Sequence, residues 1–161
     1  MHANAALLHR LFGALDKHDH STMAACYHPT ANFQDIAFNL HSGKEIHSMW
    51  HMICEGDIRV SFDVSHADDR AGRVRVVDVY TFGPAQSPSA TRRPVRNVIE
   101  SRFRFEGGLI VEQDDTCDAR QWAQAALGGV VGFLAGRFRP LRSCSARRKL
   151  RAFVDKHPEY R

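Results

Sequence analysis

Apolar residues near the start of the chain recur at spacings of three and four positions. This period is that of an amphipathic helix with one buried face, and it predicts a helix over residues 3–16. The apolar positions that carry it are Leu7, Leu8, Leu11, Phe12 and Leu15.

Two short elements are predicted to follow this first helix. Ser21, a residue type that caps helix N-termini, indicates a helix from Ser21 to Tyr27, and Pro29 is expected to end it. Residues 31–35 are then predicted to form a short strand. Further along, Ser42 and Glu45 have the spacing of a capping box, which predicts a helix from residue 43 that ends by Gly56.

The period changes to two in the second half of the chain. Alternating apolar and polar residues are typical of half-buried antiparallel strands. They predict strands over residues 58–65, 73–82, 95–105 and 109–117, with a tight hairpin at Glu106-Gly107-Gly108. Asp118 is then expected to cap a helix that runs through Trp122 to Leu127.

Helices followed by a run of strands indicate an α+β fold, with helices packed on one face of a curved antiparallel sheet. The chain has 161 residues and 43% hydrophobic residues, which suits one globular domain. We expect this domain to span residues 1–126 and a helical extension to span residues 127–161.

The charge differs between these two parts. The extension carries nine Lys and Arg against two Asp and Glu, a net charge of +7, whereas residues 1–126 have a net charge of −3. A basic tail can bind nucleic acid or an anionic membrane, but no aromatic residues alternate with these bases as a stacking platform needs. We therefore expect no nucleic-acid partner and no membrane association.

The extension also contains two groups of apolar residues. Leu150, Phe153 and Val154 form a helical stripe among basic residues, and three roles stay open for the extension: a lid over a pocket, a strap across a dimer, or a surface amphipathic helix. The other apolar residues are Val130, Val131, Phe133, Leu134, Phe138 and Leu141.

The four cysteines are widely spaced, with no Cys-x-x-Cys pair, which favours a reduced cytoplasmic compartment. The start of the chain lacks the pattern of a signal peptide. No apolar run approaches the ~20 residues that a membrane-spanning helix needs.

Three stretches of the sequence resemble the nuclear transport factor 2-like superfamily, the cone-shaped fold of SnoaL-like polyketide cyclases, ketosteroid isomerase and limonene epoxide hydrolase. They are Tyr27-His28-Pro29-Thr30-Ala31-Asn32-Phe33-Gln34-Asp35 with Gly43 and the helix after it, Arg93-Pro94-Val95-Arg96-Asn97 running on to residues 103–110, and residues 114–118 leading into Trp122. Together they span residues 5 to about 126. The resemblance implies a cone whose sheet lines a pocket, and a homodimer formed through the sheet.

Side chains that point into such a cone alternate along each strand. The expected inward set is Val76, Asp78, Tyr80, Phe82, Asn97, Ser101, Phe103, Gln113, Asp115 and Cys117 on the strands, with Phe33, Asp35, Met49 and Trp50 from the front half. From it we predict Tyr80, Asn97, Trp50, Phe33, Ser101 and Gln113 as ligand-binding residues. His28, placed near the expected mouth of the cone, is a further candidate.

Three carboxyl groups belong to the inward set: Asp35, Asp78 and Asp115. A carboxyl in an apolar pocket has a raised pKa, and a second carboxyl nearby raises one pKa further, so that one group donates a proton while the other accepts one. Such a pair can perform acid/base chemistry without a metal or cofactor, such as proton transfer beside a carbonyl, aldol ring closure or epoxide opening. The alternatives are that Asp35 ties the loop after its strand and that Asp78 faces solvent.

The resemblance places each acid in a different family pattern. Asp35 matches the general base of ketosteroid isomerase-like proteins, but that family's oxyanion-binding tyrosine and acid fall at Leu11 and Ser101. Asp78 and Asp115 match the aspartates of the epoxide hydrolase Asp-Arg-Asp site, whose arginine falls at Val76. Asp115 also lies close to the acid/base aspartate of the SnoaL-like cyclases, which makes it the first catalytic candidate.

His47 and His51 are four residues apart on a predicted helix, a spacing that suits zinc. The sequence shows no obvious third ligand, and no metal or cofactor is predicted. We expect a pocket protein that binds a hydrophobic small molecule, as a cofactor-free isomerase, cyclase or hydrolase acting on a carbonyl or epoxide. The alternative is a non-catalytic module that binds a ligand or serves association.

Overall fold

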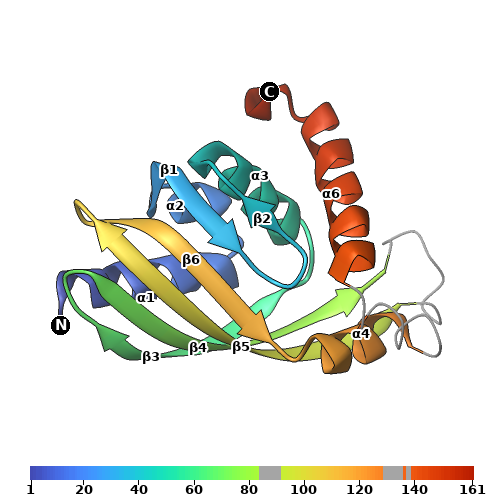
Figure 1. The fold of residues 1–161 in the computed structure, drawn as a ribbon, viewed down its shortest axis with the longest axis horizontal. Coiled ribbons are helices and arrows are strands. Elements are labelled where there is room, and N and C mark those ends of the chain that lie inside the picture. The colour runs from blue at the N-terminus through green and yellow to red at the C-terminus, as the bar shows by residue number, and fades with distance from the viewer. Residues whose placement is uncertain (84–91, 129–135, 137–138) are drawn as a thin grey trace.

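A curved sheet wraps around the N-terminal helices in this computed structural model, which describes residues 1–83, 92–128, 136 and 139–161 (Figure 1). The elements in chain order are α1 (Ala3–Asp16), α2 (His20–Ala24), β1 (Tyr27–Gln34), β2 (Asn39–Leu40), α3 (Gly43–Cys54), β3 (Arg59–Ala67), β4 (Ala71–Phe82), β5 (Arg93–Glu106), β6 (Leu109–Cys117), α4 (Ala119–Leu127), α6 (Arg139–Lys156) and the 3₁₀ turn η2 (Pro158–Tyr160). The predicted α+β architecture is confirmed.

The six strands have the order β2-β1-β6-β5-β4-β3. All neighbours are antiparallel except β1 and β6, which pair in parallel. Each of the four predicted long strands is present and matches its expected range to within two residues at either end. The two-residue strand β2 was not predicted, because a segment this short shows no periodicity.

The sheet is bent by register shifts, between Val64 and His66 on β3 and between Arg104 and Phe105 on β5. An extra residue on one strand of a pair bends that strand and increases its local twist. The β5–β6 hairpin turns at Gly107 and Gly108, whose φ angles of 58° and 77° favour glycine. The predicted hairpin at this position is therefore confirmed.

The helices fill the concave side of the sheet. Helix α1 packs against β3 and β4, and α3 packs against α2, β1 and α6. Gly72 on β4 leaves room for Leu8 of α1 and Phe105 of β5, since a Cβ atom there would lie 2.9 Å from each of these side chains. The largest fully buried side chains of this core include Leu8, Leu11, Met23, Ile46, Met49 and Ile110.

Helix α3 has the predicted N-cap, but α2 does not. Ser42 accepts a hydrogen bond from the Glu45 amide at 3.2 Å, as a capping box requires. The Glu45 carboxylate, however, accepts from the His41 amide rather than from that of Ser42. Helix α2 is capped by Asp19, which accepts from the Thr22 amide at 2.9 Å, so the prediction of Ser21 as its cap was wrong.

The predicted end of α2 was also wrong, because Tyr27 and Pro29 belong to β1. Tyr27 buries its ring and bonds to a residue of β6, which draws this segment into the sheet. Pro29 lacks an amide donor, and β1 tolerates it because the β1–β6 register shifts between Tyr27 and Asn32.

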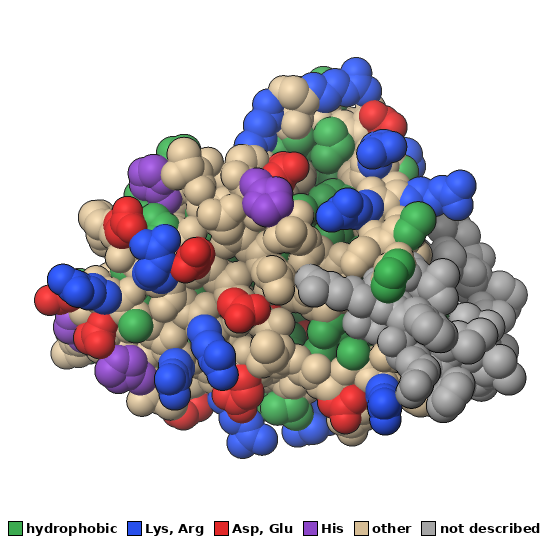
Figure 2. Space-filling model, viewed as in Figure 1, with side chains coloured by type: hydrophobic (Ala, Val, Ile, Leu, Met, Phe, Trp, Pro, Cys, Tyr) green, Lys and Arg blue, Asp and Glu red, His purple; other side chains and the backbone are tan. Residues whose placement is uncertain are grey.

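The C-terminal helix α6 packs on α3, where the Phe153 ring contacts His51, and Leu150 joins the hydrophobic core; each side chain is 8% exposed. Its basic residues Arg147, Arg148, Lys149 and Arg151 are exposed. Figure 2 shows Lys and Arg side chains gathered along α6, whereas the opposite end of this face mixes both signs. Among the described residues, no helix is long and apolar enough to cross a membrane. The apolar group predicted at residues 130–141 lies largely outside the described residues, and no side chain in it is described.

Candidate active site

A cavity of about 440 Å³ lies between the concave face of the sheet and the helices. This volume is within the range of small-molecule pockets. Its wall comes from α1, α3, the strands β1 and β3 to β6, the loop between β1 and β2, α4 and α6, and it is largely apolar. The predicted carboxyl groups Asp35, Asp78 and Asp115 all border it.

Asp115 occupies the middle of the sheet on β6. Its register partner on β5 is Ser101. On the β1 side of β6, Gln34 pairs with Asp114, so that Asp35, the residue after the end of β1, lies next to Asp115. Asp115 is half-buried, and it borders the cavity with the surface that remains accessible. The sheet therefore presents one carboxyl to the cavity with a second one next to it.

A chain of three buried side chains holds the Asp115 carboxylate. Gln113 Nε2 donates to both carboxylate oxygens at 3.0 Å, and Gln113 Oε1 accepts from the Tyr27 hydroxyl at 2.5 Å. The Tyr27 oxygen in turn accepts from Trp50 Nε1 at 3.1 Å. The Tyr27 oxygen accepts a hydrogen bond from Trp50, and the Tyr27 hydroxyl donates one to Gln113 Oε1. This orients the Gln113 amide with its NH₂ group toward Asp115.

Burial, the largest cause, together with the charges of Asp35 and Asp114 raises the pKa of Asp115 to about 7. The hydrogen bonds from Gln113 oppose this shift. The Ser101 hydroxyl also lies near enough to lower the pKa, although it forms no well-aligned hydrogen bond to the carboxyl. Desolvation outweighs the hydrogen bonds, so Asp115 exchanges its proton near neutral pH.

Asp35 has a structural task as well as a place on the cavity wall. One of its carboxylate oxygens accepts from the backbone amides of Ala37 at 2.7 Å and Phe38 at 2.5 Å. These bonds tie the loop between β1 and β2, which is the alternative role that the sequence left open. Asp35 lies close enough to raise the pKa of Asp115 by its charge.

Asp78 lies elsewhere on the same wall. It is 7% exposed, and its Oδ1 atom has no hydrogen-bond partner among the described residues. Burial raises its pKa to about 6, against the effect of the Asn97 backbone. Its predicted inward orientation is thus the one observed.

Asp78 and Asp115 border one cavity, but they do not form a contacting pair. Asp78 pairs with Asn97 and Asp115 with Ser101, four residues further along β5, or about 13 Å at the usual rise per residue. Burial is the largest cause of each raised pKa, and the carboxyl groups whose charges raise the pKa of Asp115 are Asp35 and Asp114. The sequence predicts a pair of acids in which one carboxyl raises the pKa of the other. Asp115 and Asp35 fit this expectation better than Asp115 and Asp78 do.

Polar groups near Asp78 form a second patch on the wall. The Tyr80 hydroxyl accepts from Trp122 Nε1 at 2.6 Å, which leaves its own proton free to point at a ligand. Asn97 lies beside Cys117, and burial raises the pKa of the Cys117 thiol to about 11. This thiol stays protonated at neutral pH and is not an activated nucleophile.

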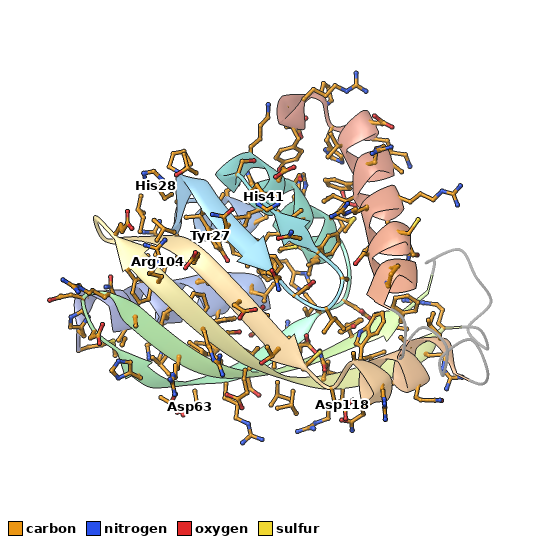
Figure 3. All side chains as sticks on the ribbon, viewed as in Figure 1. Tyr27, His28, His41, Asp63, Arg104 and Asp118 are labelled. Atoms are coloured by element: carbon orange, nitrogen blue, oxygen red, sulfur yellow. The ribbon has the colours of Figure 1, made fainter. Side chains whose placement is uncertain are left out.

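The remaining predicted ligand-binding residues separate into two groups. Phe33, Trp50 and Ser101 border the cavity. Gln113 does not, because it lies in the core at 2% exposure and serves to hold Asp115. His28 does not either: it bonds to Thr30 at 2.8 Å, at the end of the molecule remote from α4 (Figure 3).

Three residues near the site were not assigned to it from the sequence. Tyr27 was predicted to end a helix, and from that position its contact with Gln113 could not be expected. Trp122 was expected only as part of the α4 helix, although it positions Tyr80. Lys149 reaches the cavity wall from α6, where its ammonium lies 4.6 Å from the centre of the Phe82 ring. Nothing in the local sequence pattern shows this long-range contact.

The curved sheet, the helices on its concave side and the cavity between them define a protein of the nuclear transport factor 2-like cone fold. The chain belongs to the SnoaL-like domain family, whose model matches residues 8–113. The predicted resemblance is therefore confirmed. No match was found among the curated proteins.

Solved structures share the fold at low sequence identity. An LEH-like epoxide hydrolase from M. tuberculosis aligns with a TM-score of 0.61 and 17% identity, over 82% of this chain and 95% of that one. An NTF2-like protein of unknown function from Burkholderia pseudomallei aligns with a TM-score of 0.62 and 14% identity, over 79% and 99%. A protein with a ketosteroid isomerase-like fold from Catenulispora acidiphila, in complex with trimethylamine, aligns with a TM-score of 0.57 and 13% identity, over 74% and 91%. Enzymes and proteins of unknown function thus share this fold, which does not by itself define a reaction.

Proposed function

We propose that this protein is a cofactor-independent enzyme that transfers a proton on an apolar carbonyl compound, with Asp115 as the catalytic acid/base. The observation that carries the proposal is the Asp115 carboxyl itself. It borders an apolar cavity, it is oriented by two hydrogen bonds, and its pKa of about 7 suits proton transfer at neutral pH.

The proposed reaction uses the two polar parts of the cavity wall for different tasks. Asp115 removes a proton from the carbon beside the carbonyl and returns it to the product, as an isomerase or cyclase requires. Tyr80 and Asn97 offer hydrogen-bond donors that orient a polar group at the other end of the substrate. The nearby charge of Asp35 helps to raise the pKa of Asp115, which makes the Asp115 carboxylate a stronger base than an ordinary aspartate.

Epoxide hydrolysis is supported less well by the same wall. Val76, which holds the position of the arginine in the Asp-Arg-Asp pattern, is an apolar residue that is 2% exposed. It neither bridges two carboxylates nor donates to an epoxide oxygen. The roughly 13 Å between the register positions of Asp78 and Asp115 further separates the two acids that the pattern needs.

The test uses proton exchange, because it needs no knowledge of the natural product. Cyclic and aromatic ketones are first screened for binding by the rise they cause in the melting temperature. Ketones that bind are then incubated with the protein in D₂O, and the loss of the proton beside the carbonyl is followed by ¹H NMR. The proposal expects exchange with the native protein and with Asp63→Asn, whose carboxyl is exposed on β3 away from the cavity, and none with Asp115→Asn.

The alternative function is a binding module that uses the same cavity without chemistry. The Asp78 oxygen that has no partner in the described part of the chain favours it, since a ligand with a hydrogen-bond donor would satisfy that atom. Ketones that bind equally to the native protein and to Asp115→Asn, with no exchange in either, would favour this alternative and contradict the enzyme. The predicted homodimer and cytoplasmic location stay predictions, and native mass spectrometry tests the first.

A further inference from the structure

A cluster of histidine side chains lies outside the cavity, where α2 and α3 meet the C-terminal end of the chain. His20 comes from α2, His47 and His51 come from α3, and His157 follows α6. His20 Nδ1 lies 3.0 Å from His47 Nε2, and the His20 ring stacks on His51 with 3.7 Å between ring centres. The sequence shows His47 and His51 as a possible ligand pair without a third ligand, and the fold brings candidates from more than 100 residues away.

His51, His157 and Glu159 have the arrangement of a metal-ligand set. One ligand atom from each of the three lies within 4.8 Å of the other two. Ligand atoms around a tetrahedral zinc ion are about 3.3 Å apart, given metal–ligand distances near 2.0–2.1 Å. The distance between His157 Nδ1 and Glu159 Oε1 is 3.0 Å, close to this spacing, and an ion would draw the ligand atoms of the set, which lie up to 4.8 Å apart, closer together.

Both imidazole rings are held in place by their surroundings. His51 Nδ1 bonds to the Tyr160 hydroxyl at 2.9 Å, which leaves Nε2 as the ligand atom and fixes the ring, as outer partners of metal-binding histidines do. The His157 ring stacks on Phe153 at 4.1 Å between ring centres. The Glu55 carboxylate lies 3.8 Å from the other ring nitrogen, Nε2, and is an outer partner of this ring.

We propose that His51, His157 and Glu159 bind one divalent transition-metal ion, and that zinc suits the site best. Two imidazoles and a carboxylate form a set that zinc accepts, whereas calcium and magnesium prefer oxygen ligands alone. The ion joins α3 to the segment after α6. It therefore clamps α6, which supplies Ser145, Ala146 and Lys149 to the cavity wall.

The first test measures zinc affinity with tag-free, metal-stripped protein, in competition with a chromophoric chelator. The native protein is expected to bind one zinc ion, and His157→Ala and Glu159→Gln are each expected to bind it at least tenfold more weakly. Tyr160→Phe, which keeps the ring but removes the partner of His51, is expected to lower the affinity about tenfold. Circular dichroism checks that each variant is folded.

Two control variants separate this site from other zinc ligands in the chain. His28→Ala removes a histidine far from the cluster, and Cys144→Ser removes an exposed thiol. Both are expected to bind zinc as the native protein does. Substitution with Co²⁺ should give the visible absorption of a four- or five-coordinate ion in the native protein, and His157→Ala should lose it.

The proposal is contradicted if the native protein binds no zinc at a 1:1 ratio, or if His157→Ala and Glu159→Gln bind it as tightly as the native protein. It is equally contradicted if Cys144→Ser abolishes the binding. The clamp has its own readout: zinc should raise the melting temperature of the native protein and not that of His157→Ala. An equal rise in both would overturn the clamp.

Discussion

The two carboxyl groups at the two ends of the cavity wall differ in their hydrogen-bond partners. Asp115 is held by Gln113, which is itself held by Tyr27 and Trp50, whereas Asp78 keeps one oxygen without a partner among the described residues. Both pKa values are raised by burial. A carboxyl with a fixed orientation suits a repeated proton transfer, and a carboxyl with an unsatisfied atom suits the binding of a ligand group.

The largest expected effect follows from removing the acid/base. Asp115→Asn preserves the shape of the carboxyl but does not exchange protons, so the turnover of a ketone substrate should fall about 10²- to 10⁴-fold. The hydrogen–deuterium exchange rate measured by NMR checks this. Asp78→Asn should instead change substrate affinity more than turnover. Equal losses of turnover in the two variants would contradict the assignment of proton transfer to Asp115 and of substrate binding to Asp78.

The pH dependence of stability should carry the signature of Asp115. Its pKa is raised from 3.8 to about 7 in the folded state, so the folded protein binds more protons than the unfolded chain between these values. The contribution of Asp115 to the free energy of unfolding therefore falls as pH rises from about 4 to about 7, by up to about 1.4 kcal/mol per pH unit. Urea unfolding of the native protein and Asp115→Asn checks this: their difference should change over this range, and a constant difference would contradict it.

Breaking the support of Asp115 should affect both stability and chemistry. Gln113→Leu leaves the Tyr27 hydroxyl without its acceptor and Asp115 without its two donors, which should lower the free energy of unfolding by about 1–3 kcal/mol. The same change at the exposed Gln121 should stay within about 0.5 kcal/mol. Loss of the donors should also raise the pKa of Asp115 and move the pH profile of proton exchange upward. A stability loss without this shift would make Gln113 a purely structural residue.

The smallest expected effect is a gain in stability from Asp78→Asn, in contrast to the loss expected from Gln113→Leu. At pH 8 the buried carboxylate destabilises the fold, so Asp78→Asn should raise the free energy of unfolding by on the order of 1–2 kcal/mol. At pH 4 the carboxyl is already protonated, and the gain should vanish. Asp63→Asn, a change at an exposed acid on β3, should show no such gain in urea unfolding (Figure 3). A destabilised Asp78→Asn at pH 8 would mean that Asp78 holds the fold.

The spacing of apolar and polar residues along the chain predicted most of the helices and strands. The alternation of β4, β5 and β6 placed Asp78, Asn97 and Asp115 on the correct face, because side chains on a strand alternate strictly. Errors arose where a tertiary contact outweighed the local signal. Tyr27 and Pro29 resemble a helix end, yet the buried bond of Tyr27 to Gln113 draws them into β1.

The details of the two candidate sites depend on contacts between distant segments. Periodicity identified Asp35 and Asp115 as inward residues but could not show that β1 pairs in parallel with β6, which brings them together. It also gave no sign that α6 returns to α3, which places His157 and Glu159 beside His51. Alternation within a strand predicts a face, whereas the partners across that face are decided by the whole fold.

The most direct test of the central claim is the pKa of Asp115 in the folded protein, measured by ¹³C NMR of its side-chain carboxyl carbon across pH 3 to 9. Asp115→Asn identifies the signal by its absence. The account predicts a midpoint near 7, well above the ordinary value of 3.8. A midpoint near 3.8 would contradict it, because the carboxyl would then be a fully ionised group that carries no proton at neutral pH.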